Sequence, residues 1–131
     1  MNHKGYDHKS GACQLSISAV RDTLYVLSGK WKLPIIIALS SGPTRFKDLQ
    51  RELQEITPKV LSKELKELEL NEFVTRTVYA TSPVTVEYEL TEYSQSLNNI
   101  ISEMREWGLQ HRKRLMTNSR TRKKTKELQE A

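Results

Sequence analysis

Three lysines and a serine recur at helical spacing near the middle of the chain: Lys59, Ser62, Lys63 and Lys66. Positions i, i+3, i+4 and i+7 share one face of an α-helix, so these side chains would form one cationic stripe. The DNA major groove accepts an α-helix, and Lys and Ser side chains can reach phosphates and base edges from it. A helix start at Thr57 would add free N–H groups and the positive end of the helix dipole, which also suit phosphate. The stripe therefore predicts a DNA-contacting helix.

Acidic residues in the same segment leave a second interpretation open. Glu64, Glu67 and Glu69 are interspersed with the basic positions. Mixed charge is ordinary on the solvated face of a surface helix. The stripe alone does not decide between the two interpretations, so the neighbouring elements must.

The segment before the stripe favours DNA binding. Thr57 followed by Pro58 predicts an N-cap and a first helical residue, and the helix would run to about Asn71. A shorter helix with Thr44 as its N-cap would precede it, and only residues 54–56 would separate the two. Two short helices joined by such a turn indicate a helix-turn-helix. Their packed faces are predicted at Phe46, Leu49 and Leu53 and at Leu61, Leu65 and Leu68.

Behind this helix the pattern changes to that of strands. Residues 73–80 are rich in Val, Thr and Tyr, and residues 84–90 alternate apolar and polar side chains after a break at 81–83. A β-hairpin directly behind a helix-turn-helix is typical of a wing. The wing tip, residues 81–85, contains no Lys or Arg, and Arg76 in the flanking strand is the nearest cation.

Three more helices are predicted outside the helix-turn-helix. Two precede it, at about residues 17–28 and 31–40, and a long one follows Thr91, its predicted N-cap, to about Met116. The last helix carries more apolar length than a small wing domain can cover, so we expect it to form a homodimer together with the first helix. The expected contact positions are Leu97, Ile101, Met104, Gly108, His111 and Leu115.

Composition restricts the class of protein. The 131 residues suit one domain, and one cysteine excludes an internal disulfide framework and agrees with a reducing compartment. The net charge of +5 is misleading, because residues 1–104 sum to −1 and residues 105–131 to +6. The longest apolar run, 33–39, is too short to span a membrane, and no signal peptide is evident. We therefore expect a cytoplasmic protein, associated with the nucleoid when bound to DNA.

Several motifs resemble those of the HxlR-type winged-helix transcriptional regulators. They are Cys13, Ser28-Gly-Lys-Trp-Lys32, Arg45-Phe-Lys-Asp-Leu49, Ile56-Thr-Pro-Lys-Val-Leu61, Leu65-Lys-Glu-Leu-Glu69, Val78-Tyr79, Pro83 and Val86-Glu-Tyr-Glu-Leu-Thr91. The resemblance covers about residues 13–111 in the family's order. It implies a bacterial, dimeric, DNA-binding regulator without catalytic activity, whose terminal helices dimerise. It also implies that the helix at 57–71 enters the major groove.

The chain departs from the family pattern at two positions. Glu72 stands where the family commonly has Gly after the recognition helix, so this helix is expected to end by another route or to run slightly longer. Ser94 stands where Gly usually follows the Leu-Thr pair, which changes the start of the last helix. Neither position belongs to the predicted DNA-contacting face.

Cys13 has two interpretations. Members of this family often carry a cysteine here, and some use it to sense oxidants or electrophiles. A reactive thiol needs a nearby cation or helix N-terminus, and Cys13 is placed just before the first helix, with Arg21 two turns away. The alternative is an inert, buried cysteine. His3, His8 and Cys13 match no standard zinc spacing, so we expect no metal.

The sequence thus predicts a mostly α-helical winged helix-turn-helix with a small β-hairpin wing and a long terminal dimerisation helix. Its parts would be a flexible arm (1–12), a DNA-binding and dimerisation domain (13–116) and a flexible basic tail (117–131). We expect a homodimeric repressor that binds double-stranded DNA at a pseudo-palindromic operator. We expect no catalytic residues, no cofactor and no membrane partner. Rival interpretations are a non-specific DNA- or RNA-binding protein that relies on the tail, and a winged helix that docks another protein. The predicted DNA-binding residues are Thr57, Lys59, Ser62, Lys63, Lys66, Arg45 and Arg76, and Cys13 is the predicted site for an oxidant or small electrophile.

Overall fold

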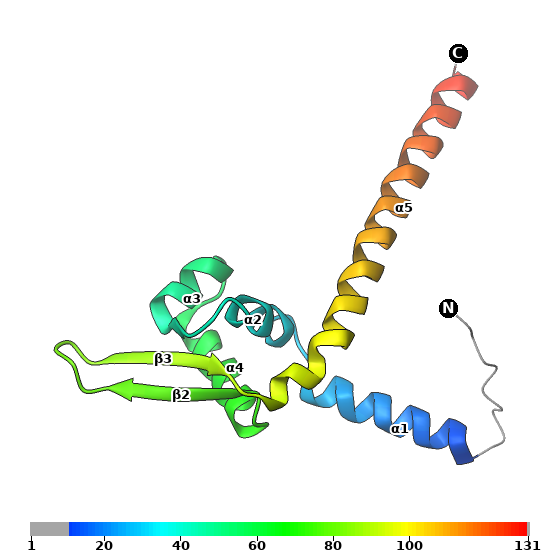
Figure 1. Ribbon diagram of the computed structural model, residues 1–131. Coiled ribbons are helices and arrows are strands. Elements are labelled where there is room, and N and C mark those ends of the chain that lie inside the picture. Colours follow the sequence, from blue (N-terminus) through cyan, green and yellow to red (C-terminus); the bar gives the residue numbers. More distant parts are fainter. Residues whose placement is uncertain (1–10, 131) are drawn as a thin grey trace. The chain divides into compact units, whose positions relative to one another are not determined.

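The computed structural model describes residues 11–130, and it confirms the mostly helical fold with a small sheet (Figure 1). The elements are α1 (Gly11–Val26), α2 (Lys32–Leu39), β1 (Thr44–Arg45), α3 (Phe46–Leu53), α4 (Pro58–Leu70), β2 (Val74–Tyr79), β3 (Thr85–Leu90), a 3₁₀ helix (Tyr93–Leu97) and α5 (Asn98–Glu130). The chain divides into two compact units, Met1–Tyr93 and Ser94–Ala131. Most of the predicted loose arm, 1–12, lies outside the described residues.

The core of the first unit lies between α2, α3, α4 and the sheet. α2 is almost entirely apolar and packs against both α3 and α4, while α4 also contacts β2. A helix that is apolar all round must be buried on most sides, which makes α2 the centre of this unit. The fully buried large side chains of the unit include Ile35, Leu39, Leu49, Leu61, Leu65 and Leu68. The predicted packed faces of the two helices are therefore confirmed at Leu49, Leu61, Leu65 and Leu68.

The turn between α3 and α4 is tight and well defined. Gln54 has φ 62° and ψ −78°, and the Glu55 N–H donates to the Leu53 carbonyl at 2.9 Å, which makes a γ-turn. α4 then starts as predicted: the Thr57 hydroxyl accepts a hydrogen bond from the Val60 N–H at 3.2 Å, and Pro58 is the first helical residue. Both ends of the turn are thus fixed by local chemistry.

The sheet has three antiparallel strands in the order β1-β3-β2. The wing hairpin was predicted, but β1 was not. Thr44 pairs with Tyr88, and Arg45 pairs with Glu87. The prediction that Thr44 caps α3 is therefore wrong: Thr44 belongs to the strand, and Arg45 is the N-cap residue, with no side-chain capping bond. The backbone pairing of Thr44 with β3 replaces the local cap.

Helix α4 ends through a motif that normally uses glycine. Glu72 has φ 66°, its N–H donates to the Glu69 carbonyl, and the Phe73 N–H donates to the Leu68 carbonyl, both at 3.0 Å. These two bonds define a Schellman motif, with Phe73 and Leu68 as its buried apolar pair. The expectation of another route or a longer helix is therefore wrong, since Glu72 itself adopts the left-handed conformation.

The helices at the two ends of the chain are longer than predicted. α1 begins at Gly11 rather than near Ile17, so Cys13 lies inside its first turn and not before it. α5 continues through the basic run to Glu130, where we expected a flexible tail after Met116. The segment after Met116 contains no Gly or Pro and is rich in Lys, Arg, Glu and Gln, which are good helix formers.

The approach to α5 also differs from the prediction. Thr91 is not the N-cap of α5, because α5 begins at Asn98. The Thr91 N–H donates to the Phe73 carbonyl at 3.0 Å, and its hydroxyl donates to the Glu72 carbonyl at 2.6 Å. A 3₁₀ turn, Tyr93–Leu97, intervenes before α5, and Ser94 is buried within it. Among residues 11–130, no helix combines the length and the apolar character needed to cross a membrane.

Candidate nucleic-acid interface

The predicted stripe is present on the surface of α4. The side chains of Lys59, Ser62, Lys63 and Lys66 are exposed, whereas Leu61, Leu65 and Leu68 on the opposite side of the helix are fully buried. Within the described residues, none of the three lysines makes an ion pair. The three cations are therefore available to an anionic partner.

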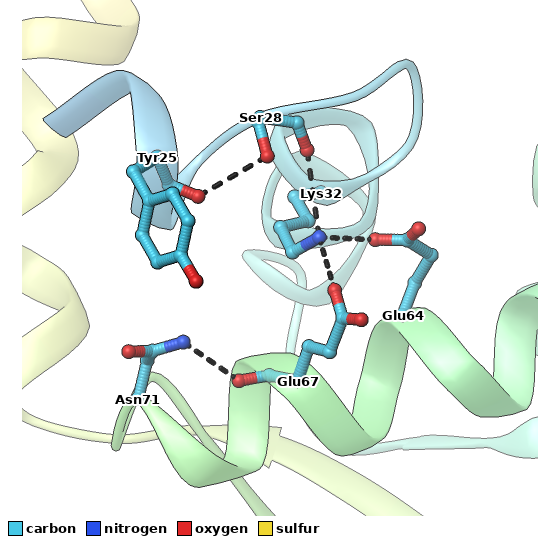
Figure 2. Close-up of polar contacts among 6 residues, drawn as sticks. All are labelled: Tyr25, Ser28, Lys32, Glu64, Glu67 and Asn71. Carbon is cyan, nitrogen blue, oxygen red and sulfur yellow. Dashed lines mark hydrogen bonds and ion pairs between the residues drawn. The ribbon is translucent and has the colours of Figure 1, made fainter. Parts of the chain in front are cut away.

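The acidic residues that weakened the DNA interpretation are largely accounted for by one buried cation. Lys32, at the start of α2, places its Nζ 2.7 Å from Glu64 Oε2 and 2.5 Å from Glu67 Oε2. Figure 2 shows the three side chains and both contacts. It also donates to the Ser28 carbonyl at 3.4 Å. Only Glu69 of the three carboxylates on this segment remains outside the Lys32 cluster, by which we mean Lys32, Glu64 and Glu67.

Lys32 and Glu67 each favour the charged form of the other. Burial of Lys32 lowers its pKa, but hydrogen bonds and charge from Glu64 and Glu67 outweigh burial, so the pKa lies above the ordinary 10.5. The hydrogen bond from Lys32, and then its charge, hold the pKa of Glu67 below the ordinary 4.5. Both groups are therefore charged at neutral pH.

A groove runs between the two helices of the helix-turn-helix and the wing. It holds a cavity of about 580 Å³, continued by a smaller one of about 240 Å³. Its cations are Arg45, Lys47, Arg51, Lys66 and Arg76, and its walls include Phe46, Val84, Val86 and Tyr88. Its acidic residues are Asp48 and Glu69, and the Asp48 carboxylate lies 3.6 Å from the Arg51 guanidinium. The groove is thus net positive.

The structure brings some of the predicted DNA-binding residues together and leaves others apart. Ser62, Lys66, Arg45 and Arg76 all line the groove. Lys59 and Lys63 do not line it, and they extend the basic surface along α4 instead. Thr57 acts as the helix cap. The wing tip contributes Pro83, Val84 and Thr85 to the groove wall but no cation, in agreement with its sequence.

Sequence reasoning missed Lys32, Lys47, Arg51 and Tyr88. Lys47 and Arg51 lie four residues apart on α3 and therefore share a helix face, a signal that was present in the sequence. Tyr88 is brought to the groove by strand pairing. Lys32 does not line the groove, and its role depends on its contact with Glu64 and Glu67 of α4. No local pattern indicates either contact.

The remaining predicted features lie elsewhere. Cys13 is buried in α1 and lines neither cavity. His3 and His8 lie outside the described residues, and the part of the chain that the structure describes holds no group of three or more His, Cys, Asp or Glu placed to bind a metal ion.

Comparison with known proteins agrees with the helix-turn-helix geometry described above. A family model described as HxlR-like helix-turn-helix matches residues 26–116. The HTH-type transcriptional regulator YtcD of Bacillus subtilis is 42% identical over 93 residues, which cover 71% of this chain and 74% of YtcD. The redox regulator HypR in its reduced form has a TM-score of 0.70 at 38% identity, covering 76% of this chain and 98% of HypR. Reduced YodB from B. subtilis has a TM-score of 0.62 at 38% identity, covering 68% of this chain and 87% of YodB.

Proposed function

Since the chain belongs to the HxlR-like helix-turn-helix family of DNA-binding transcriptional regulators, we propose that it binds a pseudo-palindromic operator as a homodimer and represses the adjoining gene. The exposed, unpaired lysine stripe on α4 is the observation that carries the proposal. Its relatives are transcriptional regulators, a class that is generally not enzymatic. Occupancy of an operator that overlaps a promoter would exclude the polymerase.

The α4 stripe and the groove have different roles in this proposal. Thr57, Lys59, Ser62, Lys63 and Lys66 belong to the helix that would enter the major groove, where Lys and Ser can contact base edges. Arg45 and Arg76 would contact the phosphate backbone beside it. The phosphate contacts would fix the position of the helix, and the α4 side chains would supply sequence preference.

Uncovered apolar side chains support the homodimer. In the single chain, α1 exposes Leu15, Ile17, Val20 and Leu24, and α5 exposes Ile100, Met104, Trp107 and Leu115. α5 alone has 33 residues and would be about 50 Å long. A helix of that length with an uncovered apolar stripe needs a partner, and a second copy of the chain supplies one by symmetry.

Sedimentation tests the homodimer directly. The wild-type chain is expected to sediment as a dimer at micromolar concentration, and Met104→Glu to shift it towards monomer while weakening operator binding. Gln110→Glu, on another face of α5, is the matched control and should leave the dimer intact. A wild-type monomer at that concentration would refute the homodimer.

We also propose that Cys13, the one cysteine of the chain, makes DNA binding sensitive to oxidants or small electrophiles. Two relatives support this: HypR is described as a redox regulator, with reduced and oxidised forms, and YodB was solved in reduced and diamide-treated forms. Cys13 is 8% exposed, so a bulky adduct could form only by displacing the residues packed around it. That displacement would act on α1, a helix of the proposed dimer interface.

Selection from random duplex DNA tests the proposed function. The expected result is an enriched inverted repeat whose half-sites lie about 34 Å, one helical turn, apart. Binding without sequence preference but with a steep salt dependence would instead indicate a non-specific nucleic-acid-binding protein that uses the basic end of α5. No binding to any duplex at physiological salt would indicate a protein-docking module.

A further inference from the structure

Glu67 lies within reach of lysines on two different sides of α4. Its carboxylate contacts the buried Lys32 at 2.5 Å, yet its side chain remains 39% exposed, compared with 13% for Glu64. Lys63 lies one helical turn before Glu67, and residues at i and i+4 are neighbours on a helix surface. Lys63 is also one of the lysines of the DNA-facing stripe. The Glu67 carboxylate could therefore form an ion pair with either the buried Lys32 or the exposed Lys63.

The structure shows Glu67 paired with Lys32 and not with Lys63. Within residues 11–130, Lys63 makes no ion pair, although its charge is one of the influences that lower the pKa of Glu67. Burial favours this choice, because an ion pair out of water is screened less than one at the surface. Helix geometry favours it too, since Lys before Glu is the weaker order for an i, i+4 pair.

Resting on the function proposed above, we propose that Lys32 is a positioning residue for DNA recognition: it holds Glu67 inward so that Lys63 is free to contact DNA. Without Lys32, the Glu67 carboxylate would lose its buried partner and turn to Lys63 at the surface. Lys63 would then have to break that pair before it could bind phosphate or a base. The buried cation thus sets the charge that α4 presents to DNA without touching DNA itself.

Glu64 provides a matched control. It shares Lys32 with Glu67, but it lies directly after Lys63 in sequence, and residues at i and i+1 do not face each other on a helix. The variants K32M/E67Q and K32M/E64Q therefore have the same net charge and both remove one carboxylate from the cluster. Only the first removes the competitor for Lys63.

The experiment measures binding of the full-length variants to a fluorescein-labelled duplex selected with the wild-type protein, over a series of salt concentrations. K32M should raise Kd roughly 3- to 10-fold and reduce the slope of log Kobs against log salt by up to about 1 per protomer, as for loss of one phosphate contact. K32M/E67Q should return both quantities towards wild type, and K32M/E64Q should not. In a K63A background, K32M should have little further effect.

A purely structural role for Lys32 predicts a different pattern. Kd would then follow the free energy of unfolding, measured on the same samples, and E67Q and E64Q would rescue equally or not at all; that result overturns the proposal. Failure of the wild type to bind the selected duplex contradicts the proposed function instead. The two failures are therefore distinguishable.

A measurement without DNA covers the case in which K32M does not fold. Carboxyl NMR titration of the wild-type and K63A chains follows the pKa of Glu67 directly. If Lys32 holds Glu67, the pKa should remain depressed when Lys63 is removed. A return to about the ordinary 4.5 in K63A would show that Lys63 is the main partner and would overturn the proposal.

Discussion

Arg76 on β2 lies directly opposite Tyr88 on β3, and both side chains line the groove beside α4. Tyr88 is 7% exposed, whereas Arg76 is exposed. Residues that face each other across an antiparallel pair lie on the same face of the sheet. The buried tyrosine thus forms part of the floor of the groove, and the neighbouring guanidinium supplies a cation at its edge.

Arg76→Ala should weaken binding to all duplexes by a similar factor and reduce the salt slope by about 1 per protomer, because a phosphate contact carries no sequence information. The measurement is Kd for selected and scrambled duplexes over a salt series. Thr77→Ala, at the next position and on the other face of the strand, is the control and should change neither quantity. A loss confined to the selected duplex would place Arg76 at a base instead.

Lys59→Ala and Lys63→Ala should weaken binding to the selected operator by about 1–3 kcal/mol each where the lysine reads a base. Lys123→Ala, in the basic end of α5, should weaken binding to the selected and the scrambled duplex by a similar factor. Competition between the two duplexes measures the discrimination. If Lys123→Ala abolishes discrimination while the α4 variants retain it, the recognition surface has been assigned to the wrong helix.

The Lys32 cluster predicts a dependence of stability on pH. Because the pKa of Glu67 in the folded state lies below the ordinary 4.5, the contribution of Glu67 to stability is complete above that pH and is lost as pH falls through the folded-state pKa. The pKa of Lys32 is raised above 10.5, so its contribution is complete below that pH and is lost as pH rises through its folded-state value. Both contributions are therefore present at neutral pH.

Urea denaturation of wild type and Glu67→Gln checks this dependence. The difference in free energy of unfolding should be largest at neutral pH and should shrink as pH falls below about 4.5. Glu69→Gln removes an exposed carboxylate of the same helix outside the cluster and serves as the control. If the difference in free energy of unfolding between wild type and Glu67→Gln does not change as pH falls, the ion pair is not its cause.

Glu72→Gly should raise the free energy of unfolding by about 0.5–1 kcal/mol, because a left-handed backbone conformation costs less for Gly than for a residue with a Cβ atom. Glu69→Gly, within the last turn of α4, should lower it by a similar amount. Thermal and urea denaturation of both variants measure the difference. Equal destabilisation by the two changes would mean that Glu72 is not strained.

Diamide should reduce the affinity of wild type for the selected operator and leave Cys13→Ser unaffected. Diamide oxidises two thiols to a disulfide, so the modified protein would carry a bridge between two Cys13 residues or a mixed disulfide with an added small thiol. A bridge requires Cα atoms within about 7 Å of each other across the dimer. Mass spectrometry identifies the product, and slow alkylation of folded wild type with unchanged binding would make Cys13 a structural residue.

Local signals predicted most of the helix-turn-helix and its wing. The start of α4 follows from Thr57 and Pro58, and its packed face from Leu61, Leu65 and Leu68, because capping and helical periodicity involve residues that are close in sequence. The alternation in residues 84–90 similarly predicted the second strand of the wing. The lysine stripe needed nothing beyond the geometry of a helix.

The features that were missed depend on contacts between distant residues. The two-residue strand β1 exists because Thr44 pairs with Tyr88. No sequence pattern near either residue indicates this pairing. The role of Lys32 depends on carboxylates on α4, and the sequence shows only a lysine beside an apolar helix. The left-handed Glu72 is set by two backbone hydrogen bonds that override the preference of the side chain.

The pairing of β1 has a mechanical consequence for the wing. β1 pairs with β3 at Tyr88 and Glu87, so the sheet has three strands at that level and two from Val86 and Val78 outward to the tip. Two-stranded ribbons twist more readily than wider sheets. The hairpin is therefore held in place where β1 pairs with it beside α3, and it is more compliant towards Thr81–Thr85. Because that compliant end has no Lys or Arg, it would respond to the width of the DNA groove more than to its charge.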